Sequence, residues 1–194
     1  MRTSEFLAAL RDRLPADCIF VSALGRTSEE LFHLAAERTL FTDTMGDVAA
    51  LSAGMALGAP SVPIAGIDTD GSFLMNLSVL PTLGRVLPGL ENHVLIIVDN
   101  GIYESAGGLP SGSENLDWES LFEAVGINAV VVREVAGMPK DVLGRAQVLI
   151  AKVVNDEPAL DSVKTIDGIE SSYRIERLIA KLAGRAERKP AIKS

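Results

Sequence analysis

The chain has 194 residues, of which 47% are hydrophobic, and carries a formal net charge of −8. Length and apolar content predict a single globular domain with a sizeable core, and residues 184–194 are expected to be a frayed tail. The negative charge disfavours binding to nucleic acid or to anionic membrane surfaces, because no basic patch is available to neutralise phosphates. Cys18 is the single cysteine. It permits no disulfide within the chain, so a reducing cytoplasm is the expected compartment.

Apolar residues follow two patterns along the chain, one typical of amphipathic helices and one of strands buried on both faces. In chain order we expect a helix at 6–14, a strand at 18–21, helices at 29–37 and 49–58, a strand at 61–67, a helix at 73–87, a strand at 90–98, a helix at 116–125, a strand at 129–135, a helix at 140–155, a strand at 159–166 and a helix at 173–182. Pro81 is expected to kink its helix. The alternation predicts an α/β, doubly wound, mainly parallel sheet of about six strands.

Two of the expected strands lead into side chains that carry oxygen. Asp70 follows the strand at 61–67, and Asn100 follows the strand at 90–98. Parallel sheets bind ligands just beyond the carboxyl ends of their strands, so we expect Asp70 and Asn100 to meet there. Either segment alone is more often an ordinary turn. Together they predict a site for a hard divalent cation such as Mg²⁺, which prefers oxygen ligands.

Gly71 and Ser72 follow Asp70 at the start of an expected helix. Their backbone N–H groups would be free there, and a phosphate would be favoured by these donors and by the helix dipole. The implied ligand is therefore a metal-bound diphosphate. Neither G-x-G-x-x-G nor G-x-x-x-x-G-K-[ST] occurs in the chain, which disfavours other nucleotide types.

The segment Asp70-Gly71-Ser72, followed by Asn100, resembles the diphosphate-binding signature of thiamine diphosphate enzymes. In that signature a GDG is followed, after a helix, by an Asn at the end of the next strand. Within these enzymes the chain resembles the 2-oxo acid decarboxylases that act on sulfopyruvate and phosphonopyruvate, over about residues 1–165. It departs from the signature at Thr69, where the family has its first glycine. The similar segments are 25–32, 44–46, 70–76 and 100–108.

The resemblance implies a set of residues for thiamine diphosphate and Mg²⁺. The metal would be held by Asp70, Asn100 and the backbone carbonyl of Ile102. A hydroxyl from Thr27 or Ser28 would bind the diphosphate, although Ser28 equally suits the N-cap of the next helix. The cofactor contacts that the resemblance implies are Thr27, Ser28, Asp43, Met45, Gly71, Ser72, Asn100, Ile102 and Tyr103.

By the same resemblance, Met45 would be the apolar residue that holds the cofactor in its bent shape. The backbone around Asp43 and Met45 would bind the aminopyrimidine edge. Met45 would otherwise be a flexible core filler. Residues 103–108 would form a mobile flap over the reacting end. Within this flap, Glu104 would act as an acid or orient the substrate, or would be only a solvated loop carboxylate.

Thiamine diphosphate enzymes of this type bind the aminopyrimidine between two modules, and a glutamate of the other module activates the cofactor. This chain has the length of the diphosphate module alone. Its Glu29, Glu30 and Glu37 lie within its own expected helix. The resemblance therefore implies the β-type subunit of a heteromer, whose partner is a pyrimidine-binding α-type subunit that supplies the activating Glu.

The reaction implied by the resemblance is decarboxylation of sulfopyruvate or phosphonopyruvate to the aldehyde and CO₂. Arg26 is the only cation that the expected active-site loops offer to an anionic substrate, so we expect the partner chain to supply part of the anion site. Two alternatives stay open. One is an acetolactate synthase-like carboligase subunit. The other is a non-catalytic cofactor-binding subunit, an idea that Thr69 and Asp47 support.

Overall fold

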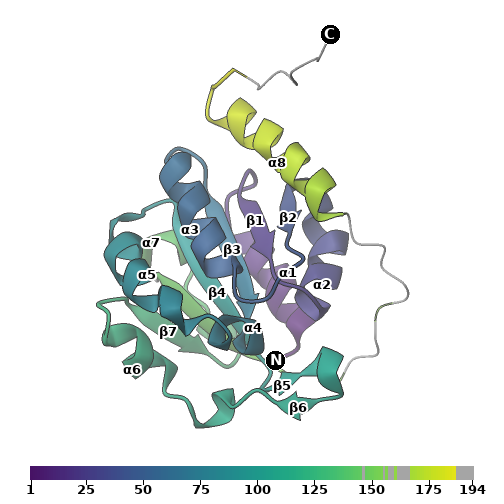
Figure 1. Cartoon of the computed structure of the whole chain (residues 1–194), viewed down its shortest axis with the longest axis vertical. Coiled ribbons are helices and arrows are strands. Elements are labelled where there is room, and N and C mark those ends of the chain that lie inside the picture. Colours follow the sequence, from purple (N-terminus) through teal and green to yellow (C-terminus); the bar gives the residue numbers. More distant parts are fainter. Residues whose placement is uncertain (146, 155, 157–159, 161–166, 187–194) are drawn as a thin grey trace.

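The computed structural model describes residues 1–145, 147–154, 156, 160 and 167–186. These residues form a six-stranded parallel sheet with helices on both faces (Figure 1). The winding direction reverses between β1 and β3, and doubly wound folds bind ligands at such a reversal. The predicted fold class is confirmed. The strand order is β2 (Thr39–Phe41), β1 (Ile19–Ser22), β3 (Ile64–Thr69), β4 (His93–Asp99), β8 (Val148–Lys152) and β7 (Ala129–Val132).

The central strands are buried on both faces because helices cover both sides of the sheet. Every residue of β1 and β4 is buried, which matches their continuous apolar sequences. Ile96 of β4 packs with Leu31 on one face, whereas Leu95 packs with Phe122 on the other. Alternate residues of one strand therefore belong to different halves of the core.

The helices divide between the two faces of the sheet. One face carries α1 (Thr3–Arg13), α2 (Arg26–Ala35) and the short α7 (Val142–Arg145). The other carries α3 (Val48–Gly58), α4 (Asp70–Leu74), α5 (Leu80–Val86), α6 (Trp118–Glu123) and α8 (Gly168–Leu182). Single 3₁₀ turns lie at Ala36–Arg38, Leu77–Val79, Leu87–Gly89, Glu104–Ala106, Ser113–Asn115 and Val135–Gly137.

A small antiparallel hairpin lies outside the main sheet. It joins β5 (Ile102–Tyr103) to β6 (Leu109–Pro110) and spans the predicted flap. Figure 1 shows it beneath the sheet, next to the N-terminus. The flap is therefore a short hairpin closed by a 3₁₀ turn.

The predicted helix at 140–155 is wrong. Of the residues described in this range, only those of α7 are helical, and the chain then forms β8, which lies between β4 and β7 in the sheet. The run Val148-Leu149-Ile150-Ala151 is buried on both faces. A short apolar run of this kind suits a central strand as well as a helix, and pairing with two neighbouring strands decides between them.

Several boundaries also differ from the prediction. The helix at 73–87 is split into α4 and α5 by residues 75–79, and Pro81 lies in the first turn of α5, where a missing N–H costs nothing. The strand β2 was not predicted. α2 begins at Arg26 and α8 at Gly168, both earlier than expected. Apart from residue 160, the predicted strand at 159–166 lies outside the described residues, as does most of the predicted tail.

Among the described residues, no helix is long and apolar enough to cross a membrane. Cys18 is fully buried just before β1, where it packs as a small core residue.

Candidate functional site

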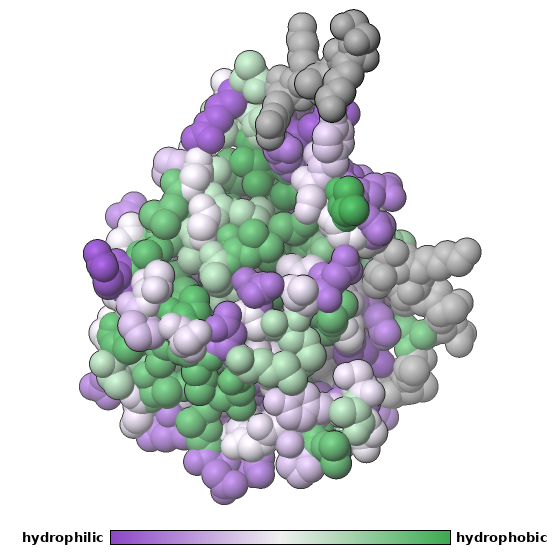
Figure 2. Space-filling model, viewed as in Figure 1, coloured by the Kyte–Doolittle hydropathy of each residue, from purple (hydrophilic) through white to green (hydrophobic). Residues whose placement is uncertain are grey.

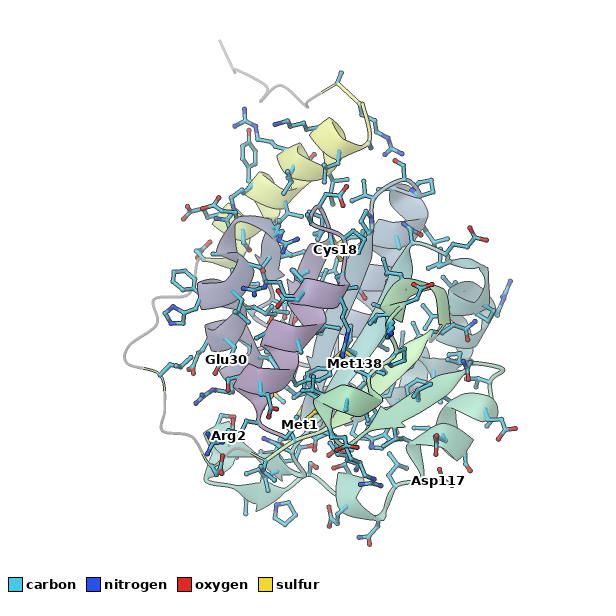
Figure 3. All side chains as sticks on the ribbon, turned by 180° about the vertical axis from the view of Figure 1, so that it is seen from behind. Met1, Arg2, Cys18, Glu30, Asp117 and Met138 are labelled. Atoms are coloured by element: carbon cyan, nitrogen blue, oxygen red, sulfur yellow. The ribbon has the colours of Figure 1, made fainter. Side chains whose placement is uncertain are left out.

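Three neighbouring strands end at one edge of the sheet and lead there into residues singled out from the sequence or directly beside them. β1 leads to Gly25 at the start of α2, β3 leads to Asp70 at the start of α4, and β4 ends at Asp99 before Asn100. A cavity of about 170 Å³ opens among these strand ends. In Figure 3, which shows the molecule from behind, Met1 and Arg2 lie at the hairpin end of the sheet and Cys18 lies at the opposite end.

The cavity brings together most of the residues singled out from the sequence. Its lining draws on six separate segments of the chain: the N-terminus of α1, the β1–α2 turn, the loop before α3, the β3–α4 turn, the end of β4 and the flap. Of the predicted residues, the cavity is lined by Arg26, Thr27, Met45, Gly71, Ser72, Asn100, Ile102, Tyr103 and Glu104. The predicted residues Ser28, Asp43 and Asp70 are not among those that line it.

Asp70 lies directly behind the cavity, between the lining residues Thr69 and Gly71, and is fully buried. Its Oδ2 accepts hydrogen bonds from Ser111 Oγ at 2.5 Å and from Ser113 Oγ at 3.0 Å. Its Oδ1 is buried without a hydrogen-bond partner. Burial raises the pKa of this carboxyl, and nearby Asp99 raises the pKa further. A buried carboxylate oxygen without a donor is costly, and a cation would remove that cost.

Asn100 is fixed by a tight turn at the end of β4. Its Oδ1 accepts the backbone N–H of Ile102 at 3.1 Å, so the side chain curls back over its own loop. Both residues line the cavity. Among the described residues, no three His, Cys, Asp and Glu side chains gather to hold a metal ion. A cation beside Asp70 would therefore need neutral oxygens, and the Asn100 loop carries an amide and carbonyls of this kind.

At Gly71 the flap lies directly against the start of α4. A Cβ at this position would lie 2.3 Å from Cε1 of Tyr103, which is shorter than any real contact. The Tyr103 hydroxyl donates to the Gly71 carbonyl oxygen at 3.4 Å. A glycine at position 71 therefore lets the flap lie over the start of α4.

Thr69 caps α4, which accounts for its departure from glycine. Its Oγ1 accepts the Ser72 N–H at 3.4 Å, and Ser72 Oγ in turn accepts the Gly46 N–H at 2.9 Å. Ser72 thereby links the Met45-Gly46 loop to the β3–α4 turn. The threonine strengthens this turn instead of disrupting it.

The two hydroxyls considered for the diphosphate have different surroundings. Thr27 lines the cavity and donates to the Ala23 carbonyl at 3.4 Å. Ser28 is buried and donates to the Gly25 carbonyl at 2.7 Å. Gly25, rather than Ser28, is the N-cap of α2, so the capping interpretation of Ser28 is wrong. Of the two residues, Thr27 is the one that faces the cavity.

Met45 and Asp43 have different surroundings in the structure. Met45 lines the cavity and is partly exposed, so it is not a core filler. Asp43 faces α8 instead, since a Cβ at Gly168 would lie 2.4 Å from its Oδ2. The prediction for Asp43 concerned its backbone, which no contact in the structure tests.

Arg26 is held by an ion pair within α2. Its Nε donates to Glu30 Oε1 at 2.8 Å, and both side chains are largely buried. Arg26 lines the same cavity as Glu104 of the flap. The guanidinium is therefore a positioned positive charge next to the flap.

A polar cluster behind Asp70 was missed by sequence reasoning. Asp99 Oδ1 lies 2.8 Å from Ser113 Oγ, whose single proton is shared between Asp99 and Asp70, and it accepts the Gly101 N–H at 3.2 Å. Its Oδ2 accepts from Trp118 Nε1 at 2.6 Å and from Lys152 Nζ. The one signal in the sequence was Asp99 itself, a charged residue that directly follows the apolar run 94–98.

Residues 24–152 match the family of thiamine pyrophosphate enzymes at their C-terminal TPP binding domain, thiamine pyrophosphate being another name for thiamine diphosphate. This match covers more than half of the chain and all of the cavity-lining segments except α1. The chain belongs to this family.

Individual relatives are similar over the same region. The chain is 31% identical to the sulfopyruvate decarboxylase subunit beta of Methanocaldococcus jannaschii over 144 residues, which are 70% of this chain and 75% of that protein. It is 37% identical to a phosphonopyruvate decarboxylase of Streptomyces viridochromogenes over 126 residues, which are 64% of this chain. The chain spans about a third of that enzyme's length, since 31% of it is covered.

The fold has a counterpart among solved structures. An X-ray structure from Mycobacterium smegmatis, assigned to the thiamin diphosphate-dependent enzymes, superposes with a TM-score of 0.63. The two sequences are 19% identical, and the match covers 80% of this chain and 32% of that one. This similarity supports the fold.

Proposed function

We propose that the cavity at the carboxyl edge of the sheet binds the diphosphate end of thiamine diphosphate through Mg²⁺. The observation that carries this proposal is the buried Oδ1 of Asp70, which has no hydrogen-bond partner and lies behind a cavity rimmed by Asn100 and Ile102. Asp70, Asn100 and the Ile102 carbonyl are the proposed metal ligands. The cofactor, when bound, supplies the electron sink that decarboxylation of a 2-oxo acid requires.

The chain's own residues would position the cofactor and close the site over it. The Thr27 hydroxyl, Gly71 and Ser72 line the cavity where the diphosphate would lie. Met45 offers an apolar surface next to them. Tyr103 covers the start of α4 from the flap, which would exclude water from the metal.

We infer that the reaction is decarboxylation of a small anionic 2-oxo acid, with sulfopyruvate and phosphonopyruvate as the leading substrates. The names of the relatives support this substrate class. Arg26 is already paired with Glu30, so it offers only part of a site for a second anionic group. The remaining positive partners would come from another chain.

A partner chain is the second part of the proposal. The matched beta subunits are by name components of larger enzymes. This chain also exposes an apolar surface on α3, a helix with no charged residue. Leu51 and Leu57 of α3 are 39% and 56% exposed, and a groove of about 840 Å³ separates α3 from α8 (Figure 2). Such a surface supports an interface with the pyrimidine-binding α-type subunit.

Cofactor and partner can be identified in one preparation. The tagged chain, purified with its co-expressed genomic neighbours, is expected to carry thiamine diphosphate when its small-molecule content is measured by mass spectrometry. Native mass measurement should give at least two copies of each of two chains. A homogeneous assembly of this chain alone that is fully active would contradict the heteromer.

Analysis of the reaction products identifies the substrate. The purified complex is incubated with pyruvate, sulfopyruvate and phosphonopyruvate, and CO₂ and organic products are followed. Aldehyde and CO₂ from one of the two anionic substrates would support the proposal. Acetolactate-type products from pyruvate alone would favour a carboligase, and bound cofactor without any turnover would favour a non-catalytic subunit. The capping role of Thr69 removes one argument for this last alternative.

A further inference from the structure

Ser111 and Ser113 hold the carboxylate of Asp70 from behind. Both hydroxyls reach its Oδ2, at 2.5 Å and 3.0 Å, while its Oδ1 is left without a partner. The two serines also contact each other, with 3.0 Å between their Oγ atoms. The carboxylate is therefore held by one oxygen, and the other oxygen is the one available to a cation.

Asp99 fixes the inner of the two serines. Its Oδ1 lies 2.8 Å from Ser113 Oγ, and its Oδ2 is bound by Trp118 Nε1 and by Lys152 Nζ. Lys152 lies opposite Asp99 in the register of β4 and β8. Trp118 and Ser113 are almost fully buried. Behind the serines there is thus an ion pair between Asp99 of β4 and Lys152 of β8, two neighbouring central strands.

The serines also lie at the end of the flap. Ser111 directly follows β6, and its backbone N–H donates to the Gly101 carbonyl at 2.9 Å. This hydrogen bond therefore joins the two ends of segment 102–110, at the edge of the sheet that carries Asp70. The same hydroxyls that hold Asp70 belong to the segment that returns from the flap.

We propose that Ser111 and Ser113 are positioning residues that aim Oδ1 of Asp70 at the divalent cation and couple occupation of the metal site to the position of the flap. The inference rests on the proposed function, because it takes Asp70 to be a metal ligand. Residues that orient a metal ligand through hydrogen bonds commonly change metal affinity tenfold or more when removed. Ser113→Ala removes the link to Asp99, and Ser111→Ala removes the shortest bond to Asp70.

The test measures Mn²⁺ affinity by electron paramagnetic resonance on the full chain, in the complex in which it purifies. Ser113→Ala and Ser111→Ala are expected to weaken Mn²⁺ binding by about tenfold or more relative to wild type. Ser61→Ala is the matched control. Ser61 is an exposed serine that precedes β3, at the opposite edge of the sheet, and its replacement should leave the affinity unchanged. Thermal unfolding without metal shows that each variant is folded.

A second readout separates positioning from general stability. At saturating Mn²⁺, chymotrypsin cleavage after Tyr103 is followed by mass spectrometry. Mn²⁺ should slow this cleavage in wild type and in Ser61→Ala. In Ser113→Ala it should slow the cleavage much less, because the bound cation is no longer connected to the returning end of the flap.

The possible results separate the two proposals. Wild-type affinity in both Ser111→Ala and Ser113→Ala would overturn the inference and leave the metal site intact. Absence of Mn²⁺ binding and of thiamine diphosphate in the wild-type complex would overturn the proposed function and this inference together. If Ser113→Ala does not fold, Ser111→Ala decides, since Ser111 is only partly buried.

Discussion

Cys18 and His93 are buried in the core at the amino ends of β1 and β4, away from the sheet edge that carries Asp70. Burial disfavours the charged form of each side chain. It raises the pKa of the Cys18 thiol to about 12 and lowers the pKa of His93 to about 4. Neither residue contacts the cavity, so both are expected to act on stability and not on chemistry.

The Cys18 thiol should be unreactive in the folded chain. Its raised pKa leaves almost no thiolate at mildly alkaline pH, and the side chain is inaccessible. A thiol reagent followed by mass spectrometry should label the denatured chain rapidly and the native chain many times more slowly. Equal labelling rates in the two states would show that Cys18 is exposed.

His93 should make stability depend on pH. Its Nε2 lies 3.0 Å from Ser52 Oγ, and its pKa falls from 6.5 in the unfolded chain to about 4 in the folded one. Between these values the unfolded chain binds a proton that the folded chain does not, so stability falls as pH drops from 6.5 to about 4. The loss contributed by this group is about 3 kcal/mol.

The His93 contribution is isolated by difference. Burial raises the pKa of Asp68 from 3.8 to about 6, and this shift has the opposite sign, since the folded chain then keeps the extra proton. Denaturant unfolding of wild type and His93→Gln should therefore be compared from pH 4 to 7. As pH falls, the free energy of unfolding of wild type should decrease relative to that of His93→Gln. Parallel pH profiles would contradict the assignment.

At the scale of elements, α3 lies unusually close to β3. The sequence of α3 is rich in small residues, a composition that favours a close approach to another backbone. The structure confirms it, because a Cβ at Gly66 of β3 would lie 2.3 Å from Ser52 Oγ of α3. Helix and strand can pack at this distance only while position 66 has no side chain.

Gly66→Ala is expected to destabilise the fold by about 1–3 kcal/mol, because the added methyl group forces α3 away from the sheet. Gly54→Ala is the matched control, since a Cβ at Gly54 meets nothing within 4 Å. That control should be neutral or stabilising by about 0.5–1 kcal/mol, as expected for alanine in place of glycine within a helix. Equal midpoints in urea for the two variants would contradict the close packing.

The sequence predicted the elements whose patterns were long and unambiguous. The apolar runs of β3 and β4, and the Asp70 and Asn100 turns that follow them, were located from pattern alone. β8 was mistaken for part of a helix, because a buried strand of five residues has no alternation to distinguish it. The bonds from Ser111 and Ser113 to Asp70 could not be predicted, since spacing along the chain does not show which loop residues return to a site.

At the scale of the whole molecule, the exposed surface of α3 is the feature that an isolated chain does not explain. Leu51 is 39% exposed beside the groove formed with α8, and Ile179 of α8 lines the same groove. Figure 2 shows apolar residues gathered over this face. In the proposed heteromer this surface would be covered by the α-type subunit.

Leu51→Glu is expected to weaken assembly, because it places a charge in an apolar interface. Native mass measurement at low micromolar concentration should show free subunits where wild type shows a complex. Ile169→Glu is the control, since Ile169 is 83% exposed at the start of α8 and does not line the groove. An unchanged complex in Leu51→Glu would place the interface elsewhere.

The most direct test of the account is cofactor retention by Asp70→Ala. Wild-type complex, stripped with a chelator and given thiamine diphosphate with Mg²⁺, should regain the cofactor only when the metal is present. Asp70→Ala removes the buried carboxylate and should retain no cofactor under the same conditions. Asp17→Ala, which removes an exposed carboxylate before β1, should behave as wild type. If folded, assembled Asp70→Ala held thiamine diphosphate as tightly as wild type, the metal site assigned to Asp70 would be wrong.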